Sequence, residues 1–207
     1  MRTQTGNGIE VIFFDLGGVI VHVDYGGLLH KLHALTRLPE DEIQMAVVDS
    51  ELTFRFDRGE ISPQQFYQIL SGQLRLPVSF VEFSEIWTNM FRLNREVAEL
   101  IPKLSERYRL LLISNTDPLH FGHVQQRFPV LSLLEGFILS YQTGRLKPEP
   151  EIYLEALRTA KVSSDACLFI DDIEANIRGA QALGIAGIVY NSKTDLKSEL
   201  ASHGVRV

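Results

Sequence analysis

The chain of 207 residues has a single cysteine, Cys167, and no long hydrophobic run. No disulfide can therefore form within it, and its cysteine usage gives no sign of secretion. The longest apolar runs, such as residues 11–14 and 110–113, are far too short to cross a membrane. The first ten residues hold no apolar stretch, so we expect no signal peptide and a cytoplasmic protein.

Clusters of basic residues are also missing. Lysine and arginine total 20 against 26 aspartates and glutamates, which gives a formal net charge of −6. Such a surface repels the phosphates of nucleic acids and anionic lipids, so we expect neither as a partner. No G-x-G-x-x-G follows the first apolar run, and no G-x-x-x-x-G-K-[S/T] occurs, which excludes the common nucleotide-binding loops.

Short apolar runs predict a parallel sheet. They cover residues 11–14, 110–113, 136–139, 167–170 and 186–190. Runs that are apolar at every position fit strands buried on both faces. Helical patterns lie between them, as at Val97, Leu100 and Ile101. The alternation predicts an α/β fold with a Rossmann-like open parallel sheet.

One region breaks this alternation. From about residue 25 to residue 91 no strand-like run occurs, and only helical patterns are present. Ser62-Pro63-Gln64-Gln65 predicts the start of a helix with a capping box. We therefore expect a small all-helical subdomain at residues 22–92, inserted after the first strand of a core formed by residues 1–21 and 93–207.

Polar residues follow the predicted strands. Asp15 follows the first run, Ser114 the second, and Asp171 and Asp172 the run at 167–170. Lys147 follows the strand predicted at 136–139. Open parallel sheets bind ligands at the carboxyl ends of their strands, so we expect these side chains to meet.

Three of these side chains are carboxylates, and they need a positive partner. If Asp15, Asp171 and Asp172 lay about 4 Å apart, each pair would repel by roughly 4 kcal/mol at a dielectric constant near 20. Hard oxygen ligands with room for water suit Mg²⁺. Lys147 and Ser114 can hold an anionic group opposite the metal, an arrangement that suits phosphoryl transfer. Asp15 is then the candidate nucleophile.

Taken alone, each of these residues has a structural explanation: a helix cap, a turn residue or a solvated lysine. The functional interpretation is favoured because all of them fall at the ends of predicted parallel strands. Asp117, which precedes Pro118, is interpreted only as the N-cap of a helix. Gly17 and Gly18 predict a tight loop with positive φ, which is compatible with a site.

Four ordered segments resemble the haloacid dehalogenase-like hydrolases: residues 14–19 (Phe-Asp-Leu-Gly-Gly-Val), 112–116, 144–148 and 169–176. The resemblance implies that the helical subdomain is a cap and that the reaction passes through an aspartyl phosphate that water cleaves. It assigns Asp15 and Lys147 as catalytic, Ser114, Asn115 and Lys147 as phosphate-binding, and Asp15, Gly17, Asp171 and Asp172 as Mg²⁺ ligands.

The Asp-Leu-Gly first motif is similar to that of capped sugar-phosphate phosphatases, which implies a small phosphorylated metabolite such as glucose 1-phosphate. The usual first motif has an acid/base aspartate where this chain has Gly17. His22 and Asp24 are candidates to replace this acid/base group and, like Arg58, candidate substrate-specificity residues, although hinge and helix-cap roles explain them as well. Arg58 is a candidate substrate contact or a surface salt-bridge residue.

Two other functions remain open at this stage. The first is a non-catalytic or very slow protein that binds a phosphorylated ligand, which Gly17 favours. The second is a 2-haloacid dehalogenase, which would use Asp15 without a metal and would leave Asp171 and Asp172 unexplained.

Overall fold

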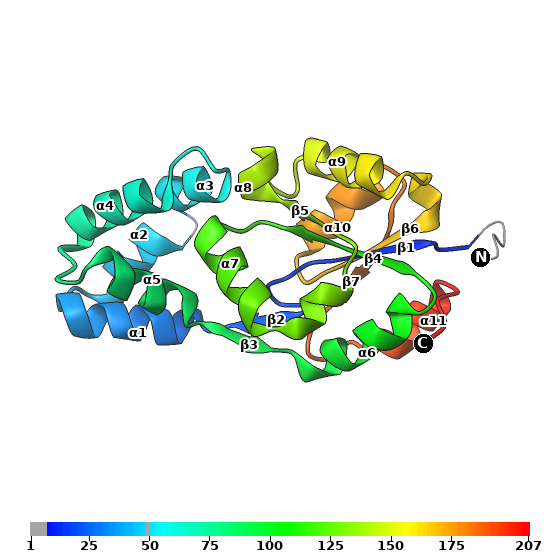
Figure 1. Cartoon of the computed structure of the whole chain (residues 1–207), viewed down its shortest axis with the longest axis horizontal. Coiled ribbons are helices and arrows are strands. Elements are labelled where there is room, and N and C mark those ends of the chain that lie inside the picture. Colours follow the sequence, from blue (N-terminus) through cyan, green and yellow to red (C-terminus); the bar gives the residue numbers. More distant parts are fainter. Residues whose placement is uncertain (1–7, 49) are drawn as a thin grey trace.

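The computed structural model describes residues 8–48 and 50–207 (Figure 1). Its core is a parallel sheet with strand order β5-β4-β1-β6-β7. The strands are β1 (Val11–Phe14), β4 (Arg109–Ser114), β5 (Gly136–Leu139), β6 (Cys167–Asp171) and β7 (Ala186–Val189). All five predicted strands and the open parallel sheet are confirmed.

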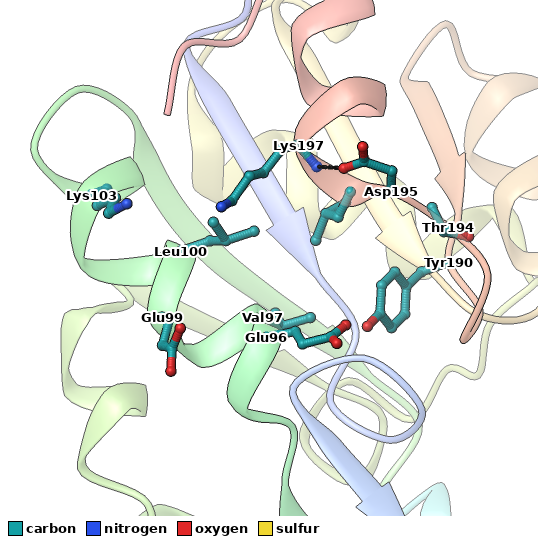
Figure 2. A pocket seen from close by; sticks show the side chains of 10 residues that line it. Glu96, Val97, Glu99, Leu100, Lys103, Tyr190, Thr194, Asp195 and Lys197 are labelled. Carbon is teal, nitrogen blue, oxygen red and sulfur yellow. Dashed lines mark hydrogen bonds between the residues drawn. The ribbon is translucent and has the colours of Figure 1, made fainter.

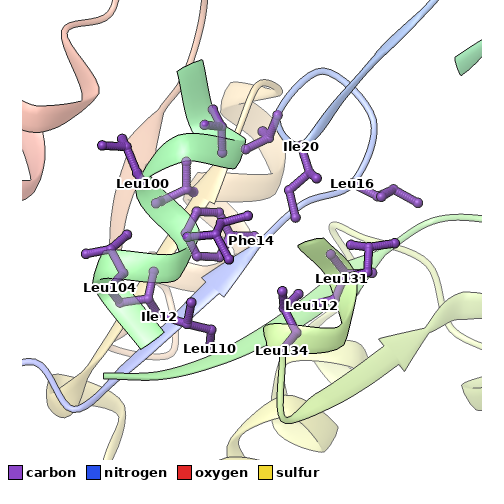
Figure 3. Packing of buried hydrophobic residues seen from close by; sticks show 14 of the residues in the cluster. Ile12, Phe14, Leu16, Ile20, Leu100, Leu104, Leu110, Leu112, Leu131 and Leu134 are labelled. Carbon is purple, nitrogen blue, oxygen red and sulfur yellow. The ribbon is translucent and has the colours of Figure 1, made fainter. Parts of the chain in front are cut away.

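Helices cover both faces of this sheet. Ile12 and Phe14 point to a face covered by α6 (Arg95–Ser105), α7 (Pro118–Arg127), the 3₁₀ helix η1 (Pro129–Leu133) and α11 (Leu196–Ser202). Val11 and Phe13 point to the other face, covered by α9 (Pro150–Ala160) and α10 (Glu174–Gln181). Figure 3 shows the first cluster, in which Leu100 lies near Phe14. Burial on both sides explains why the strands are apolar at every position.

A separate helical unit lies at one end of the molecule (Figure 1). It contains α1 (Tyr25–Thr36), α2 (Glu40–Val47), α3 (Glu51–Asp57), α4 (Pro63–Leu74) and α5 (Phe80–Thr88). These helices bury a hydrophobic cluster of their own, with Phe56, Phe66 and Trp87 inside it. The predicted capping box is present at the start of α4, where Ser62 and Gln65 each accept the other's backbone N–H.

Two short strands connect the helical unit to the core. β2 (Val21–Val23) and β3 (Phe91–Leu93) pair antiparallel, and neither was predicted because three residues are too few to show a period. The short helices α8 (Ser140–Thr143) and η2 (Ser164–Ala166) complete the elements. Within the described residues, no helix combines the length and apolar character that a membrane span requires.

Candidate active site

The carboxyl edge of the sheet brings the predicted carboxylates together. Asp15 directly follows β1, and Asp171 is the last residue of the neighbouring strand β6. Asp172 follows it. Each of the three offers a carboxylate oxygen within 4.8 Å of the others. We call these residues, together with Lys147, the carboxylate cluster.

Lys147 lies buried among these carboxylates. Its Nζ is 2.8 Å from Asp15 Oδ1 and 2.6 Å from Asp171 Oδ2, and it stands 5.4 Å from the centre of the Phe169 ring. Burial alone lowers the pKa of this lysine, but the charges and hydrogen bonds of the two aspartates outweigh burial and raise the pKa. Lys147 is therefore a fixed positive charge at neutral pH.

Asp171 is held in place by the chain that follows it. Its Oδ1 accepts the N–H of Ile173 at 2.8 Å, and the Asn176 amide donates to its two oxygens at 3.0 and 3.1 Å. Beneath the site, the Tyr153 hydroxyl donates to the Asn176 carbonyl at 2.8 Å. Burial, with the charges of Asp171 and Asp15, raises the pKa of Tyr153, so this phenol stays a donor.

The loop after β1 approaches Asp172 closely at Gly18. Gly18 has φ +74°, a backbone conformation that favours glycine. A Cβ there would also lie 2.1 Å from Asp172 Oδ2, so a side chain would collide with that carboxylate. Gly17 is different, because its φ lies outside the left-handed region and a Cβ would meet Val23 Cγ2 at 3.3 Å. The expectation of positive φ is therefore confirmed for Gly18 and wrong for Gly17.

The carboxylate cluster carries an excess of negative charge. When Asp15, Asp171 and Asp172 are all ionised, the single positive charge of Lys147 leaves two negative charges unbalanced. Burial raises the pKa of Asp15, opposed by Lys147 and reinforced by Asp171. Burial and the charge of Asp171 likewise raise the pKa of Asp172. A divalent cation supplies the missing charge, and carboxylate oxygens are the donors that Mg²⁺ prefers, so these residues fit that ion.

Ser114 and Asn115 occupy the loop after β4. Ser114 is buried at the end of the strand, next to β1. The Asn115 side chain is engaged with the backbone of Lys147: Oδ1 accepts its N–H at 2.7 Å, and Nδ2 donates to its carbonyl at 3.0 Å. Asn115 thus fixes the segment that carries the lysine, and phosphate binding by either residue stays a prediction.

His22 and Asp24 lie on the connection to the helical unit. His22 is exposed on β2, opposite Arg92 of β3. Asp24 is the N-cap of α1, and its carboxylate accepts the N–H of Gly27 at 2.9 Å. Neither residue belongs to the carboxylate cluster.

Arg58 joins the helical unit to the core. Its guanidinium pairs with Glu149, and it also reaches the Gly144 carbonyl at 3.5 Å. The neighbouring Gly59 has φ +69°, and a Cβ there would lie 2.2 Å from the Tyr141 carbonyl oxygen of α8. The helical unit therefore contacts the segment that leads to Lys147. No sequence signal pairs Arg58 with Glu149, because 91 residues separate them.

A cavity of about 580 Å³ lies apart from this site (Figure 2). Glu96 and Leu100 of α6 line it, with Tyr190 and Lys197 opposite. No member of the carboxylate cluster lines it, so the chemistry and this cavity are separate features.

A family model described as haloacid dehalogenase-like hydrolase matches residues 9–184. The chain belongs to this family of hydrolases, as its four sequence segments predict.

Named phosphatases are among its relatives. A D-ribitol-5-phosphate phosphatase of Bacteroides thetaiotaomicron is 27% identical over 205 residues, which cover 93% of this chain and 97% of the relative. A sesquiterpene phosphatase of Aspergillus oryzae is 26% identical over 181 residues, 86% of this chain and 88% of the relative. A solved structure of a haloacid dehalogenase family enzyme from B. thetaiotaomicron, a complex with magnesium and inorganic phosphate, is 28% identical with a TM-score of 0.83, and the match covers 93% of this chain and 99% of that one.

Proposed function

We propose that this hydrolase is a Mg²⁺-dependent phosphatase that acts on a small phosphorylated metabolite. The observation that carries the proposal is Lys147 Nζ, placed 2.8 Å from Asp15 and 2.6 Å from Asp171. A carboxylate nucleophile, a fixed positive charge and a set of cation ligands meet at one point, as phosphoryl transfer requires. The relatives named as phosphatases support the same activity.

Asp15 supplies the nucleophile. Lys147 and the N–H of Leu16, at 2.6 Å, both hold Oδ1, so we assign Oδ2 to the attack on phosphorus. As the Oδ2–P bond forms, the bond from phosphorus to the ester oxygen breaks, and the departing alkoxide takes a proton from solvent to give the alcohol. Water then attacks the aspartyl phosphate, which releases orthophosphate and restores the carboxylate. Lys147 and Ser114 hold the phosphoryl oxygens in both steps.

We assign the metal site to Asp15, the backbone carbonyl of Gly17, Asp171 and Asp172. When bound, Mg²⁺ supplies positive charge that stabilises the phosphoryl oxygens in the transition state. The related structure, a complex with magnesium and phosphate, supports magnesium as the ion. Asn115 keeps Lys147 in place while the metal and the substrate bind.

We assign residues 22–92 as a cap over the core of residues 1–21 and 93–207. Caps of this kind exclude water and select the substrate. Arg58, on the cap, lies against the segment of Lys147 and is our candidate for a specificity residue. A sugar or polyol phosphate is the substrate class we favour, with glucose 1-phosphate as one example. The D-ribitol-5-phosphate phosphatase relative supports this class.

Gly17 favours a second candidate function, a protein that binds a phosphorylated ligand with little turnover. General acid–base help contributes about 10²–10⁴-fold to a rate, and Gly17 has no side chain to provide it. The variant Gly17→Asp separates the two functions, because only Val23 Cγ2 stands near the added Cβ. In a phosphatase, this variant raises kcat for an alkyl phosphate more than for p-nitrophenyl phosphate, whose leaving group needs no proton. In a binding protein, wild type releases almost no phosphate from either ester, and turnover is first seen in the variant.

Phosphate release tests the proposed activity directly. We would assay glucose 1-phosphate, ribitol 5-phosphate and p-nitrophenyl phosphate with Mg²⁺ and with a chelator, using wild type, Asp15→Ala and the control Asp165→Ala, an exposed aspartate. Release that needs Mg²⁺ and is lost only in Asp15→Ala is the expected result. No release from any ester, with Mg²⁺ and orthophosphate still bound, would contradict the proposal and favour the binding protein. Chloride release from 2-chloropropionate without Mg²⁺ would indicate a dehalogenase.

A further inference from the structure

A second buried cluster of polar and charged groups lies where the cap meets the core. It joins Trp87, at the end of cap helix α5, to Asp117 and His120, at the start of core helix α7. We call these three residues the cap–core joint. Trp87 and Asp117 are almost fully buried, and Leu119 of α7 packs against the hydrophobic cluster of the cap. The proposed reaction uses none of these residues.

The Asp117 carboxylate accepts three N–H groups and lies against an imidazole nitrogen. It is the predicted N-cap of α7, and its Oδ1 accepts the backbone N–H of Leu119 at 2.8 Å and of His120 at 2.9 Å. Its Oδ2 accepts the indole N–H of Trp87 at 3.0 Å and lies 2.7 Å from His120 Nδ1. An oxygen with this surrounding is an acceptor only, so Asp117 is ionised.

The ring of His120 lies between two acceptors. Nδ1 faces the Asp117 carboxylate, and Nε2 lies 3.0 Å from the Trp87 carbonyl oxygen. A neutral imidazole has one N–H and can satisfy only one of them, whereas an imidazolium satisfies both. The Trp87 carbonyl belongs to the last turn of α5, where carbonyls lack helical partners and the helix dipole favours a positive charge.

The aromatic surroundings favour the same charge state. The His120 ring stacks on the Trp87 indole with centroids 5.1 Å apart and planes 6° apart, and it forms a T-shaped pair with Phe91 whose centroids are 4.9 Å apart. A cation over the face of tryptophan is stabilised by the quadrupole of the ring. Phe91 belongs to β3, so His120 contacts the cap, the connecting strand and the core together.

The nearby charges act in the same direction. Burial lowers the pKa of His120, but Asp117, the Trp87 carbonyl and the charge of Asp57 at the end of α3 outweigh burial and raise it. Burial alone would raise the pKa of Asp117, and His120 and Trp87 lower it. Two further titratable groups interact electrostatically with this pair: His123, one turn further along α7, with His120, and Tyr141 of α8 with Asp117. α5 and β3 contribute uncharged rings.

We propose that His120 is a positioning residue: as an imidazolium, it joins the end of the cap to the start of α7, three residues beyond Asn115, and so sets the affinity for the phosphate-bearing ligand. This role rests on the proposed function for its catalytic readout. Loss of the proton leaves one ring nitrogen facing an acceptor at hydrogen-bond distance, and that contact becomes repulsive. The cap and the start of α7 then keep the Trp87–Asp117 hydrogen bond but lose a His120 contact, and affinity falls.

The fluorescence of Trp87 reports the protonation state of His120 and does not require turnover. Trp87 is the only tryptophan of the chain, and a stacked imidazolium quenches indole emission by accepting an electron, whereas neutral imidazole does so weakly. We expect emission to rise with pH, with a midpoint above the ordinary histidine pKa of 6.5. His120→Gln should abolish this titration, and His123→Gln, on the same helix, should retain it. Emission that does not titrate, or that titrates equally in His120→Gln, would overturn the proposal.

Ligand affinity completes the test. We would measure the KM and kcat of p-nitrophenyl phosphate with Mg²⁺, and the Kd of orthophosphate with Mg²⁺ by calorimetry, across the same pH range. KM and Kd in wild type should rise at least about fivefold through the fluorescence midpoint while kcat changes less. In His120→Gln both should be high at every pH. KM and Kd values that stay constant through the fluorescence midpoint would overturn the positioning role. Absence of turnover in wild type would defeat the proposed phosphatase, and the emission and orthophosphate measurements would still decide the role of His120.

Discussion

The carboxylate cluster and the cap–core joint are both buried and ionic, but they differ in their balance of charge. In the carboxylate cluster three aspartates share the single positive charge of Lys147, which pairs with Asp15 and Asp171. At the joint one carboxylate, Asp117, pairs with one imidazole, His120, and every polar side-chain atom of the pair has a hydrogen-bond partner. Buried charge is costly unless it is paired, so the first cluster needs a cation from solution and the second needs only a proton. The same physics thus makes one region respond to metal and the other to pH.

The largest effect should follow the loss of the positive charge in the carboxylate cluster. We expect Lys147→Ala to reduce phosphatase turnover by about 10³-fold, because no fixed charge then holds the phosphoryl group. Mg²⁺ affinity should not fall, since three carboxylates remain without their lysine. Steady-state rates and metal titration measure the two effects, with the exposed Lys103→Ala as control. Wild-type turnover in Lys147→Ala would contradict our assignment of the site.

Crowding of the metal ligands should give the next largest effect. Gly18 and Gly144 have nearly the same backbone, with φ +74° and +71°, but only Gly18 faces an obstacle, namely Asp172. Gly18→Ala should weaken Mg²⁺ binding by about 10–100-fold through displacement of that carboxylate. Gly144→Ala should show the backbone strain alone. Equal metal affinities in the two variants, measured by calorimetry, would show that Asp172 is not a ligand.

Removing the charge of Asp117 at the cap–core joint should lower the free energy of unfolding. Asp117 and Asp195 are both N-caps that accept two backbone N–H groups, but Asp117 is buried against His120 and Asp195 is exposed. Asp117→Asn should lower the free energy of unfolding by about 3 kcal/mol, because it leaves the imidazolium without its partner. Asp195→Asn should cost much less, since asparagine is itself a good N-cap.

The pH dependence of this loss follows from the two pKa shifts. The lowered pKa of Asp117 gives stability that is present above its ordinary value of 3.8 and is lost as pH falls through its native pKa. The raised pKa of His120 gives stability that is present below 6.5 and is lost as pH rises through its native pKa. Urea unfolding should therefore show the largest gap between wild type and Asp117→Asn between pH 3.8 and 6.5. A gap that grows at higher pH would contradict the imidazolium.

The smallest effect should come from the contact of the cap with Glu149. Arg58 and Glu149 are partly exposed, and such pairs contribute about 0.2–1 kcal/mol. Arg58→Ala should raise KM a few-fold or change the ranking of sugar phosphates, with the same Mg²⁺ dependence as wild type. Arg55→Ala, which removes a neighbouring pair with Glu60 inside the cap, is the matched control. An unchanged substrate profile in Arg58→Ala would exclude Arg58 from the site.

The sequence predicts features that depend on local pattern. The run Val11–Phe14 is apolar throughout because both faces of β1 are covered, and Asp15 follows it directly, so the strand and the site residue were predicted together. The capping box at Ser62 and the N-cap at Asp117 are equally local, and both are confirmed.

Contacts between residues that lie far apart in the chain could not be predicted from the sequence. Trp87 and His120 stand 33 residues apart, and no spacing rule pairs them. The contact of the Asn115 amide with the backbone of Lys147 was not predicted either, because only the folded loop creates it. The strands β2 and β3 were missed because their partner strand, rather than their own composition, makes them strands.

The pairing of β2 with β3 has a mechanical consequence. Both passages of the chain between cap and core run side by side, and backbone hydrogen bonds beyond the strands, from Asp24 to Met90 and from Asn94 to Ile20, bind them further. The paired strands β2 and β3 thus form a hinge between cap and core, and Arg58 and Gly59 make a contact with the core away from this hinge. A rotation of the cap about this hinge moves Arg58 and Gly59 away from the core more than it moves β2 and β3. His120 contacts Phe91 on β3 and so lies near the hinge. A small change in the cap–core angle there produces a larger displacement at Arg58 and Gly59.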